Sequence, residues 1–313
     1  MSTTLRVPLP GSVDVPASVE FLRRNGDDLM DRWDGDRLIR VLTVEGRRVP
    51  VSMRPSGSPD APELLVTLSE EAASGTDSAA LRAAVTEQFA ACGPAWPLLL
   101  REDSALAALV DRSPNIRPLT LTDPLYALVR AITAQQVNLK FATAIRARLS
   151  KNFGTAYRVD GETVYALEPE ALAGADAAVL RALQLSERKA GYLIEVAGAI
   201  LDGRLDVAKL AALEPEEYLR TMTAVRGIGR WTADWFAARV LGRAVVVAGD
   251  VGLRKAVGIL YGAGMPTELQ VRRLTAHWGE AAHIAQQFAF ESLASPAAVS
   301  NASHTDADTD TDT

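Results

Sequence analysis

The sequence has few of the residues on which disulfide, redox and metal chemistry depend. Its 313 residues include one cysteine, Cys92, and three histidines. A single cysteine excludes an internal disulfide framework and any four-cysteine zinc or iron–sulfur site. Three histidines also disfavour a histidine-rich metal centre. We therefore expect no metal site, and we expect Cys92 to be a small buried apolar residue.

Long apolar runs are also missing. No stretch approaches the roughly 20 residues that a membrane-spanning helix needs. Residues 1–11 lack the basic start and the apolar run of a secretory signal peptide. These absences predict a cytoplasmic protein with no membrane partner, and we expect a monomer.

A general surplus of basic residues is absent as well. The formal net charge is −6, whereas phosphate neutralisation supplies much of the affinity of most nucleic-acid binders. The charge is unevenly distributed, however. Residues 216–255 contain seven Lys or Arg and four Asp or Glu, and no basic residue follows Arg273. The net charge therefore understates the basic character of one segment.

The first third of the chain predicts a small antiparallel sheet with helices. Short segments rich in β-branched residues are separated by turn residues, and residues 55–62 are expected to form a turn-rich loop. Apolar spacing typical of a helix follows over residues 79–91. The expected strands are 38–44, 48–53 and 64–68. We interpret residues 1–104 as an N-terminal α+β domain.

The rest of the chain is a succession of helix signals. Asp123-Pro124 is an N-cap followed by proline at the first helical position. Ser186 and Glu214-Pro215 begin further helices. Residues 105–295 are therefore predicted to form two all-α subdomains, which makes the fold class α+β.

Two charged regions are expected to face solvent. Residues 296–313 are rich in Asp and Thr and are expected to form a disordered acidic tail. The basic residues of the helix expected over 137–149 are interpreted as its solvated face. They are Lys140, Arg146 and Arg148.

The stretch 215–240 is the most informative part of the sequence. It predicts a helix, a tight turn at Arg226-Gly-Ile-Gly229 and a second helix from Arg230. The glycines permit positive φ and close approach of the backbone, and Ile228 can pack between the two helices. Free backbone N–H groups of the turn and the second helix would point outward together, which suits one phosphate. An ordinary helical hairpin with a glycine turn explains the same pattern.

A carboxylate follows at Gly249-Asp250, after the apolar run 244–248. Asp250 is placed to cap the helix that begins at Val251. A structural cap and a catalytic carboxylate are both compatible with this position. The two roles do not exclude each other.

Together, residues 226–233 and 249–254 resemble the helix-hairpin-helix DNA glycosylase superfamily, whose signature is a hairpin followed by an invariant Asp. The form Gly-Ile-Gly-Arg-Trp-Thr-Ala is most similar to bacterial 3-methyladenine DNA glycosylase II. Residues 123–138 resemble the helix and loop that precede the family's intercalating residue. The resemblance extends over residues 17–293 and is strongest around these motifs.

The resemblance assigns a role to each matching position. Asp250 is implied to be the catalytic carboxylate, and Gln136 falls where the family inserts a wedge into the gap left by the flipped nucleotide. The positions implied to contact DNA are Gln136, Arg226, Gly227, Gly229, Arg230, Thr232 and Arg254. The positions implied to bind the damaged base are Phe21, Gln135, Trp231 and Trp235.

Three positions depart from the family pattern. Arg226 replaces the proline that usually precedes the first hairpin glycine, and Gln136 is polar where close relatives often have an apolar wedge. Residues 278–285 lack the proline, second aromatic residue and arginine of the family's Trp-x-Pro-aromatic-Arg pattern. The far wall of the base pocket, and with it the substrate range, is therefore left open.

The implied reaction is hydrolytic removal of a damaged base from double-stranded DNA. Positive charge builds on the deoxyribose as the base leaves, and a nearby carboxylate stabilises that charge or activates a water. One carboxylate suffices when the leaving base is already cationic, as an N3- or N7-alkylated purine is. Trp231 and Trp235 share a helix face and could hold such a base by cation–π contact. A Trp pair at this spacing is equally typical of a hydrophobic core.

Bifunctional members of the superfamily carry a lysine two residues after the second hairpin glycine, where this sequence has Trp231. We therefore expect a monofunctional glycosylase without lyase chemistry, associated with the nucleoid in the cytoplasm. No cofactor is implied, and a monovalent cation at the hairpin is left open. Two alternatives remain: a glycosylase for deaminated or oxidised bases, and a non-catalytic DNA-binding module that uses the same hairpin.

Overall fold

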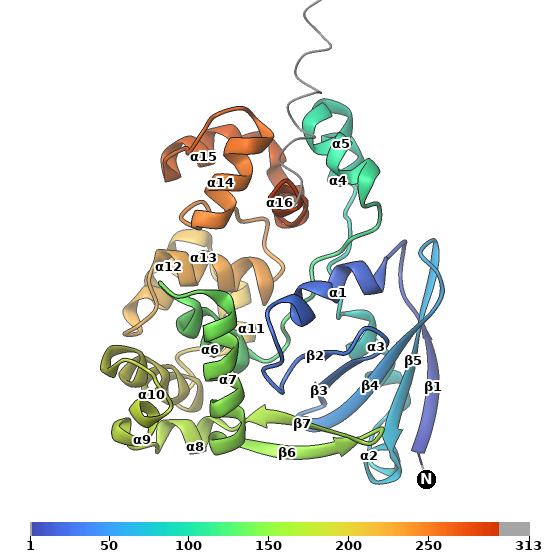
Figure 1. Cartoon of the computed structure of the whole chain (residues 1–313), viewed down its shortest axis with the longest axis vertical. Helices are drawn as coiled ribbons and strands as arrows, with labels where there is room; N and C mark the ends of the chain where they lie inside the picture. The colour runs from blue at the N-terminus through green and yellow to red at the C-terminus, as the bar shows by residue number, and fades with distance from the viewer. Residues whose placement is uncertain (1, 294–313) are drawn as a thin grey trace, which may run out of the picture.

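The computed structural model describes residues 2–293 and confirms the α+β fold class (Figure 1). Its N-terminal part contains a five-stranded antiparallel sheet in the order β1-β5-β4-β3-β2. The strands are β1 (Ser2–Pro8), β2 (Arg32–Trp33), β3 (Leu38–Val44), β4 (Arg47–Ser58) and β5 (Ala61–Ser69). The three predicted strands lie within β3, β4 and β5, whereas the sequence does not predict β1 and β2.

The expected loop at 55–62 is wrong, because β4 and β5 continue through it as one long hairpin. Ser58 pairs with Ala61, so only a tight turn separates the strands. β3 pairs with β4 as far as Met53, and prolines are tolerated beyond that point because β4 is an edge strand there. Gly57 is required, since its φ is +79° and a Cβ would overlap the carbonyl oxygen of Ala61.

The sheet packs against one helix that lies between its first two strands in the sequence and another that follows its last strand. Apolar side chains of α1 (Val15–Arg24) and α3 (Ser78–Thr86) join those of the strands in one core. The short helix α2 (Glu70–Ser74) lies between β5 and α3 in the sequence. The helix predicted over 79–91 is thus present but ends earlier, at Thr86.

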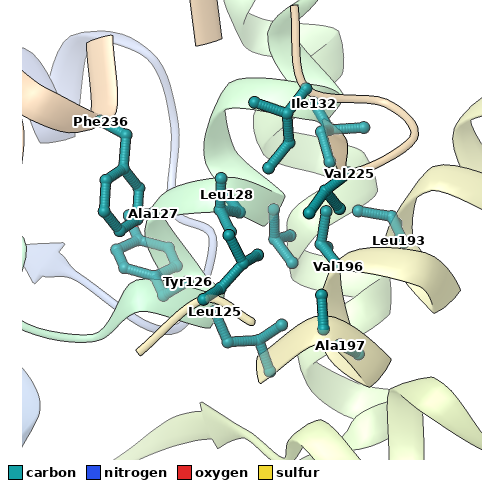
Figure 2. Close-up of a cluster of buried hydrophobic side chains, with 14 of the residues drawn as sticks. Leu125, Tyr126, Ala127, Leu128, Ile132, Leu193, Val196, Ala197, Val225 and Phe236 are labelled. Carbon is teal, nitrogen blue, oxygen red and sulfur yellow. The ribbon is translucent and has the colours of Figure 1, made fainter. Parts of the chain in front are cut away.

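A first helical subdomain surrounds α6 (Pro124–Ala134). Figure 2 shows the buried side chains of α6 between Leu193 of α10 and Phe236 of α13. Asp123 accepts the N–H of Tyr126 at 2.9 Å, so the predicted N-cap is confirmed. The other helices are α7 (Leu139–Phe153), α8 (Pro169–Ala173), α9 (Ala177–Ala182), α10 (Glu187–Leu201), α11 (Val207–Ala212), α12 (Pro215–Ala224) and α13 (Arg230–Arg239).

The expectation that residues 105–295 are all-α is wrong in one place. β6 (Gly154–Val159) and β7 (Glu162–Leu167) form an antiparallel hairpin. Asp160 and Gly161 form its turn with φ of +51° and +81°, values typical of the two-residue turns that match strand twist. Val159 and Val164 pack against Ile39 of β3, so the hairpin is stabilised by the N-terminal sheet.

A second helical subdomain combines distant parts of the chain. Helices α4 and α5 share one hydrophobic core with the last helices (Figure 1). The predicted domain boundary at residue 104 therefore falls between two helices of the same core. The members are α4 (Ala95–Glu102), α5 (Ser104–Arg112), α14 (Val251–Leu260), α15 (Glu268–Leu274), η1 (Ala276–Ala281) and α16 (Ala282–Glu291).

Arg146 corrects the expectation of a solvated face on α7. Its side chain is buried, and its Nε donates to Asp28 Oδ2 at 2.8 Å. The hydroxyl of Tyr126 donates to the same oxygen at 3.0 Å. Nearby, Arg40 Nη2 donates to Asp31 Oδ2 at 3.1 Å. Buried charges need such partners, and this network joins the N-terminal part to α6 and α7.

The predicted acidic tail, residues 296–313, lies outside the described residues. Within residues 2–293, no helix is long and apolar enough to cross a membrane. Among the same residues, no group of three or more His, Cys, Asp or Glu side chains comes together as a metal site would require.

Candidate active site and nucleic-acid interface

The predicted hairpin is present between α12 and α13. Gly227 in its turn has a φ of +101°, and a Cβ there would lie 2.5 Å from the ring of Tyr192 on α10. Ile228 is 4% exposed and packs in the first helical core, as its place between the glycines predicts. Both the backbone conformation and the close approach of α10 therefore require glycine at position 227.

The N-terminus of α13 is open. Gly229 is its N-cap residue, and no described side chain caps the helix. No described atom lies within 4 Å of a Cβ built on Gly229, apart from its own neighbours. The first N–H groups of a helix have no partner within it, and the exposed side chains of Arg226 and Arg230 flank this end. The arrangement can bind an anion such as a phosphate.

Two residues predicted to contact DNA have side chains engaged elsewhere. Thr232 is 1% exposed, and its hydroxyl accepts a hydrogen bond from Gln135 Nε2 at 3.3 Å. This burial contradicts a direct contact between the Thr232 side chain and DNA, and it leaves that role to the backbone of the hairpin. Arg254 is half-buried, and its Nε donates to the carbonyl oxygen of Pro266 at 2.7 Å.

Asp250 has both carboxylate oxygens engaged by donors. Oδ1 accepts the N–H of Leu253 at 2.9 Å, so the predicted cap of α14 is confirmed. Oδ2 accepts the Nε1–H of Trp231 at 3.0 Å. Because the two donors come from different helices, they fix the orientation of a half-buried carboxylate beside the hairpin.

The space around this carboxylate is tight. A Cβ on Gly252 would lie 3.0 Å from Asp250 Oδ1 and 3.2 Å from Cε1 of Phe290 on α16. Gly252 is helical, so the lack of space rather than an unusual φ requires glycine there. Phe290 therefore belongs to the surroundings of Asp250.

The two tryptophans lie where the helical subdomains meet. Their ring centroids are 6.5 Å apart, with an angle of 24° between the planes. Trp235 packs against both helical cores, and Trp231 packs against the second. Both side chains are half-buried, so the pair is part of the core and is also partly accessible next to Asp250.

Phe21 lies against a half-buried cation of α6. The guanidinium carbon of Arg130 is 5.4 Å from the Phe21 ring centroid, and Arg130 also donates to the hydroxyl of Tyr126 at 2.8 Å. Burial lowers the pKa of Arg239 to about 10; Arg130 acts in the same direction and the Asp250 carboxylate in the opposite one. Arg239 thus stays protonated at neutral pH and interacts with the Asp250 carboxylate.

Gln136, the predicted wedge, is exposed on the loop after α6. Its φ is +55°, which is uncommon for a residue other than glycine and costs roughly 1–3 kcal/mol. Lys189 of α10 holds the loop, since its Nζ donates to the carbonyl oxygens of Thr133 at 3.0 Å and Gln135 at 2.7 Å. Burial lowers the pKa of Lys189. A wedge needs such a fixed support.

A cavity of about 620 Å³ lies on another face of α13. From this helix it is lined by Arg230, Asp234 and Ala237, which are spaced to share a face. The tryptophans and Asp250 do not line it, so this cavity is separate from the site around the carboxylate.

The segment that carries the wedge loop, the hairpin and the Asp250 carboxylate matches a known family. The match covers residues 129–281, and the family is described as HhH-GPD superfamily base excision DNA repair protein. The matched residues make up just under half of the chain. Phe21 lies outside this segment.

Relatives of the HhH-GPD segment include named glycosylases. DNA-3-methyladenine glycosylase 2 of Escherichia coli (strain K12) is 33% identical over 137 residues, which are 44% of this chain and 48% of that protein. The chain thus matches about half the length of this relative.

Solved structures share the fold over most of the chain. The 3-methyladenine DNA-glycosylase from Archaeoglobus fulgidus superposes with a TM-score of 0.78 and 24% identity, over 92% of this chain and 98% of that chain. An 8-oxoguanine glycosylase/lyase of Clostridium acetobutylicum in complex with DNA gives a TM-score of 0.65 and 18% identity, over 83% and 85% of the two chains. At these identities the likeness shows the fold alone.

Sequence reasoning missed several residues around the HhH-GPD site. Arg239 had a weak signal, because it follows Trp235 by one helical turn. The others have no local signal, since their partners are distant in the sequence. The missed residues are Arg130, Lys189, Tyr192, Arg239 and Phe290.

Proposed function

We propose that the chain is a monofunctional DNA glycosylase, which hydrolyses the N-glycosidic bond of alkylated purines in double-stranded DNA during base excision repair. The observation that carries the proposal is the Asp250 carboxylate, held by Trp231 and Leu253 next to an uncapped helix N-terminus. The similarity to DNA-3-methyladenine glycosylase 2 supports the alkylated-purine substrate.

The proposed reaction assigns the steps to separate parts of the site. The hairpin N–H groups hold a backbone phosphate, and Gln136 fills the gap when the damaged nucleotide leaves the stack, which costs a few kcal/mol. The half-buried tryptophans offer ring faces to a cationic base, worth about 0.5–2 kcal/mol. Asp250 then stabilises the positive charge on the deoxyribose or accepts a proton from the attacking water. These steps require no cofactor, and they require only one copy of the chain.

The absence of lyase chemistry is part of the proposal. Trp231 occupies the position where bifunctional members of the superfamily carry lysine, and its Nε1–H is donated to Asp250. An indole nitrogen cannot form a Schiff base with the sugar. Incubation with abasic DNA and borohydride is therefore expected to trap no covalent complex, and a trapped complex would overturn the monofunctional assignment.

A second substrate class is favoured by one observation. Arg239 is a half-buried cation that interacts electrostatically with the Asp250 carboxylate, and Arg130 is a second cation near Arg239. Positive charge disfavours a cationic base, and it stabilises the negative charge that builds on a neutral leaving base. Deaminated or oxidised bases such as hypoxanthine, uracil or 8-oxoguanine are therefore the alternative substrates.

A lesion-panel excision assay tests the proposal. Duplexes that contain one 7-methylguanine, 3-methyladenine, hypoxanthine, uracil or 8-oxoguanine are incubated with the wild type and with Asp250→Asn. We expect release of the methylated purines and a loss of about 10²- to 10⁴-fold in the variant. Release of only the neutral bases selects the alternative substrates. Binding of abasic DNA without any release selects the non-catalytic DNA-binding module, and release that survives Asp250→Asn refutes the mechanism.

A further inference from the structure

Two exposed arginines meet at one aromatic ring between the wedge loop and the hairpin. The guanidinium carbon of Arg188 is 6.0 Å from the ring centroid of Tyr192, and that of Arg226 is 5.8 Å from the same centroid. Arg188 also donates to the Tyr192 hydroxyl, from Nη2 at 3.1 Å and from Nε at 3.3 Å. Two separate elements, α10 and the hairpin turn, therefore bring two cations to a single side chain.

The ring itself is firmly placed. Tyr192 is half-buried, and its Cγ and Cβ lie against Gly227, where no side chain would fit. Contact with a fixed ring reduces the conformational freedom that an exposed arginine loses when it binds a ligand. The cluster is therefore preorganised to bind rather than merely solvated.

The charge of the cluster is not balanced. Among residues 2–293, neither Arg188 nor Arg226 has a carboxylate within ion-pair distance, whereas some other exposed arginines do. Both guanidinium groups are exposed. They are near each other because both lie beside the same ring. An anion that lies between them would be attracted by both guanidinium groups.

The position of the cluster identifies the anion. Lys189, the neighbour of Arg188, holds the loop that carries Gln136, and Tyr192 supports the hairpin that carries Gly229. A nucleic-acid strand that reaches both the wedge and the hairpin must therefore pass the first turns of α10. We propose that Arg188 and Arg226, both held by Tyr192, form a clamp for a DNA backbone phosphate other than the one held by the hairpin N–H groups. This inference rests on the proposed function, because it takes DNA as the ligand.

The salt dependence of DNA binding tests the clamp. Binding of a fluorescent duplex with an abasic-site analogue is measured between 50 and 200 mM salt for the wild type, Arg188→Ala, Arg188→Lys and Arg101→Ala. Each phosphate contact contributes about 0.9 to the slope of log affinity against log salt. We expect Arg188→Ala to lower the slope by about 1 and to weaken binding roughly threefold to tenfold, and Arg188→Lys to keep the slope.

Arg101 is the matched control. It is exposed on α4, in the other helical subdomain, and its loss changes the net charge by the same amount. The clamp is overturned if Arg188→Ala has the slope of Arg101→Ala, or if Arg188→Lys loses as much as Arg188→Ala. Base release at saturating enzyme is expected to be unchanged in Arg101→Ala. A wild type that does not bind DNA refutes the proposed function, whereas normal binding with unchanged slopes refutes the clamp alone.

Discussion

Asp250 combines a helix cap with an acceptor for the Trp231 indole, and substitutions can separate the two. Asparagine caps helices about as well as aspartate. In Asp250→Asn the amide oxygen can still accept the Leu253 N–H. The amide nitrogen then faces the Trp231 Nε1–H, so two donors meet where a donor met an acceptor. Alanine removes both interactions.

The structure sets the size of each effect. Loss of an N-cap costs about 0.5–2 kcal/mol, and loss of a hydrogen bond to a charged acceptor about 1.5–3 kcal/mol. The free energy of unfolding should therefore fall by about 1.5–3 kcal/mol in Asp250→Asn and by roughly 2–5 kcal/mol in Asp250→Ala. In the Asn background the indole bond is already lost. Trp231→Phe should thus cost about 1.5–3 kcal/mol less there than in the wild type.

Urea unfolding followed by circular dichroism measures these differences. Asp206 is the matched control, because it caps α11 through the N–H of Lys209 at 2.9 Å and no second donor to it is found among the described residues. Asp206→Asn should be nearly neutral. The reasoning fails if Asp250→Asn is as stable as Asp206→Asn, or if Asp250→Ala is no less stable than Asp250→Asn.

Two further predictions concern the surroundings of the site. Gly227→Ala should weaken DNA binding and lower stability by roughly 1–3 kcal/mol, because the position has a positive φ and faces the Tyr192 ring; unchanged melting and binding would contradict this. Burial raises the pKa of Asp103, but hydrogen bonds from Tyr261 and a histidine outweigh it, so the pKa lies below its usual 3.8. A lowered folded-state pKa gives stability that is present above pH 3.8 and is lost as pH falls through the folded pKa. Tyr261→Phe should reduce this acid-sensitive stability, because Asp103 loses one of its donors, and it should also lower stability at every pH, because Trp278 loses its acceptor; together these effects should cost about 1–3 kcal/mol, and equal pH profiles of unfolding for the variant and the wild type would refute the link.

Local chemistry explains which parts of the fold the sequence predicts. Asp123, Ser186 and Asp250 were expected to begin helices, and all three side chains accept N–H groups three residues on. A helix cap joins residues that are close in the chain, so a short stretch of sequence is enough to predict it. β1 is predicted poorly because its seven residues are mostly exposed and depend on pairing with β5. The hairpin at 154–167 did have a local signal, the Asp-Gly turn, which the surrounding helix signals obscured.

The same distinction applies to the site. The hairpin, Asp250 and the exposed Gln136 are identified by short motifs and by the resemblance that those motifs carry. All three lie within residues 129–281. Burial of Thr232 could not be predicted, because its neighbours include residues distant in the sequence, such as Gln135 at the end of α6. Tyr192 and Phe290 are likewise selected by close approach of distant backbone, which a single sequence does not reveal.

The packing of α4 and α5 against α14 and α16 has a consequence for the order of folding. Asp250 is oriented by α14, and α14 packs in a core whose other members include residues before position 113 and after position 281. Contacts between such distant parts of a chain form late, because a long loop must close first. During synthesis, the hairpin and its supporting helices are therefore complete before the second core can assemble. The Asp250 carboxylate acquires its final surroundings only when α16 packs against α4 and α5.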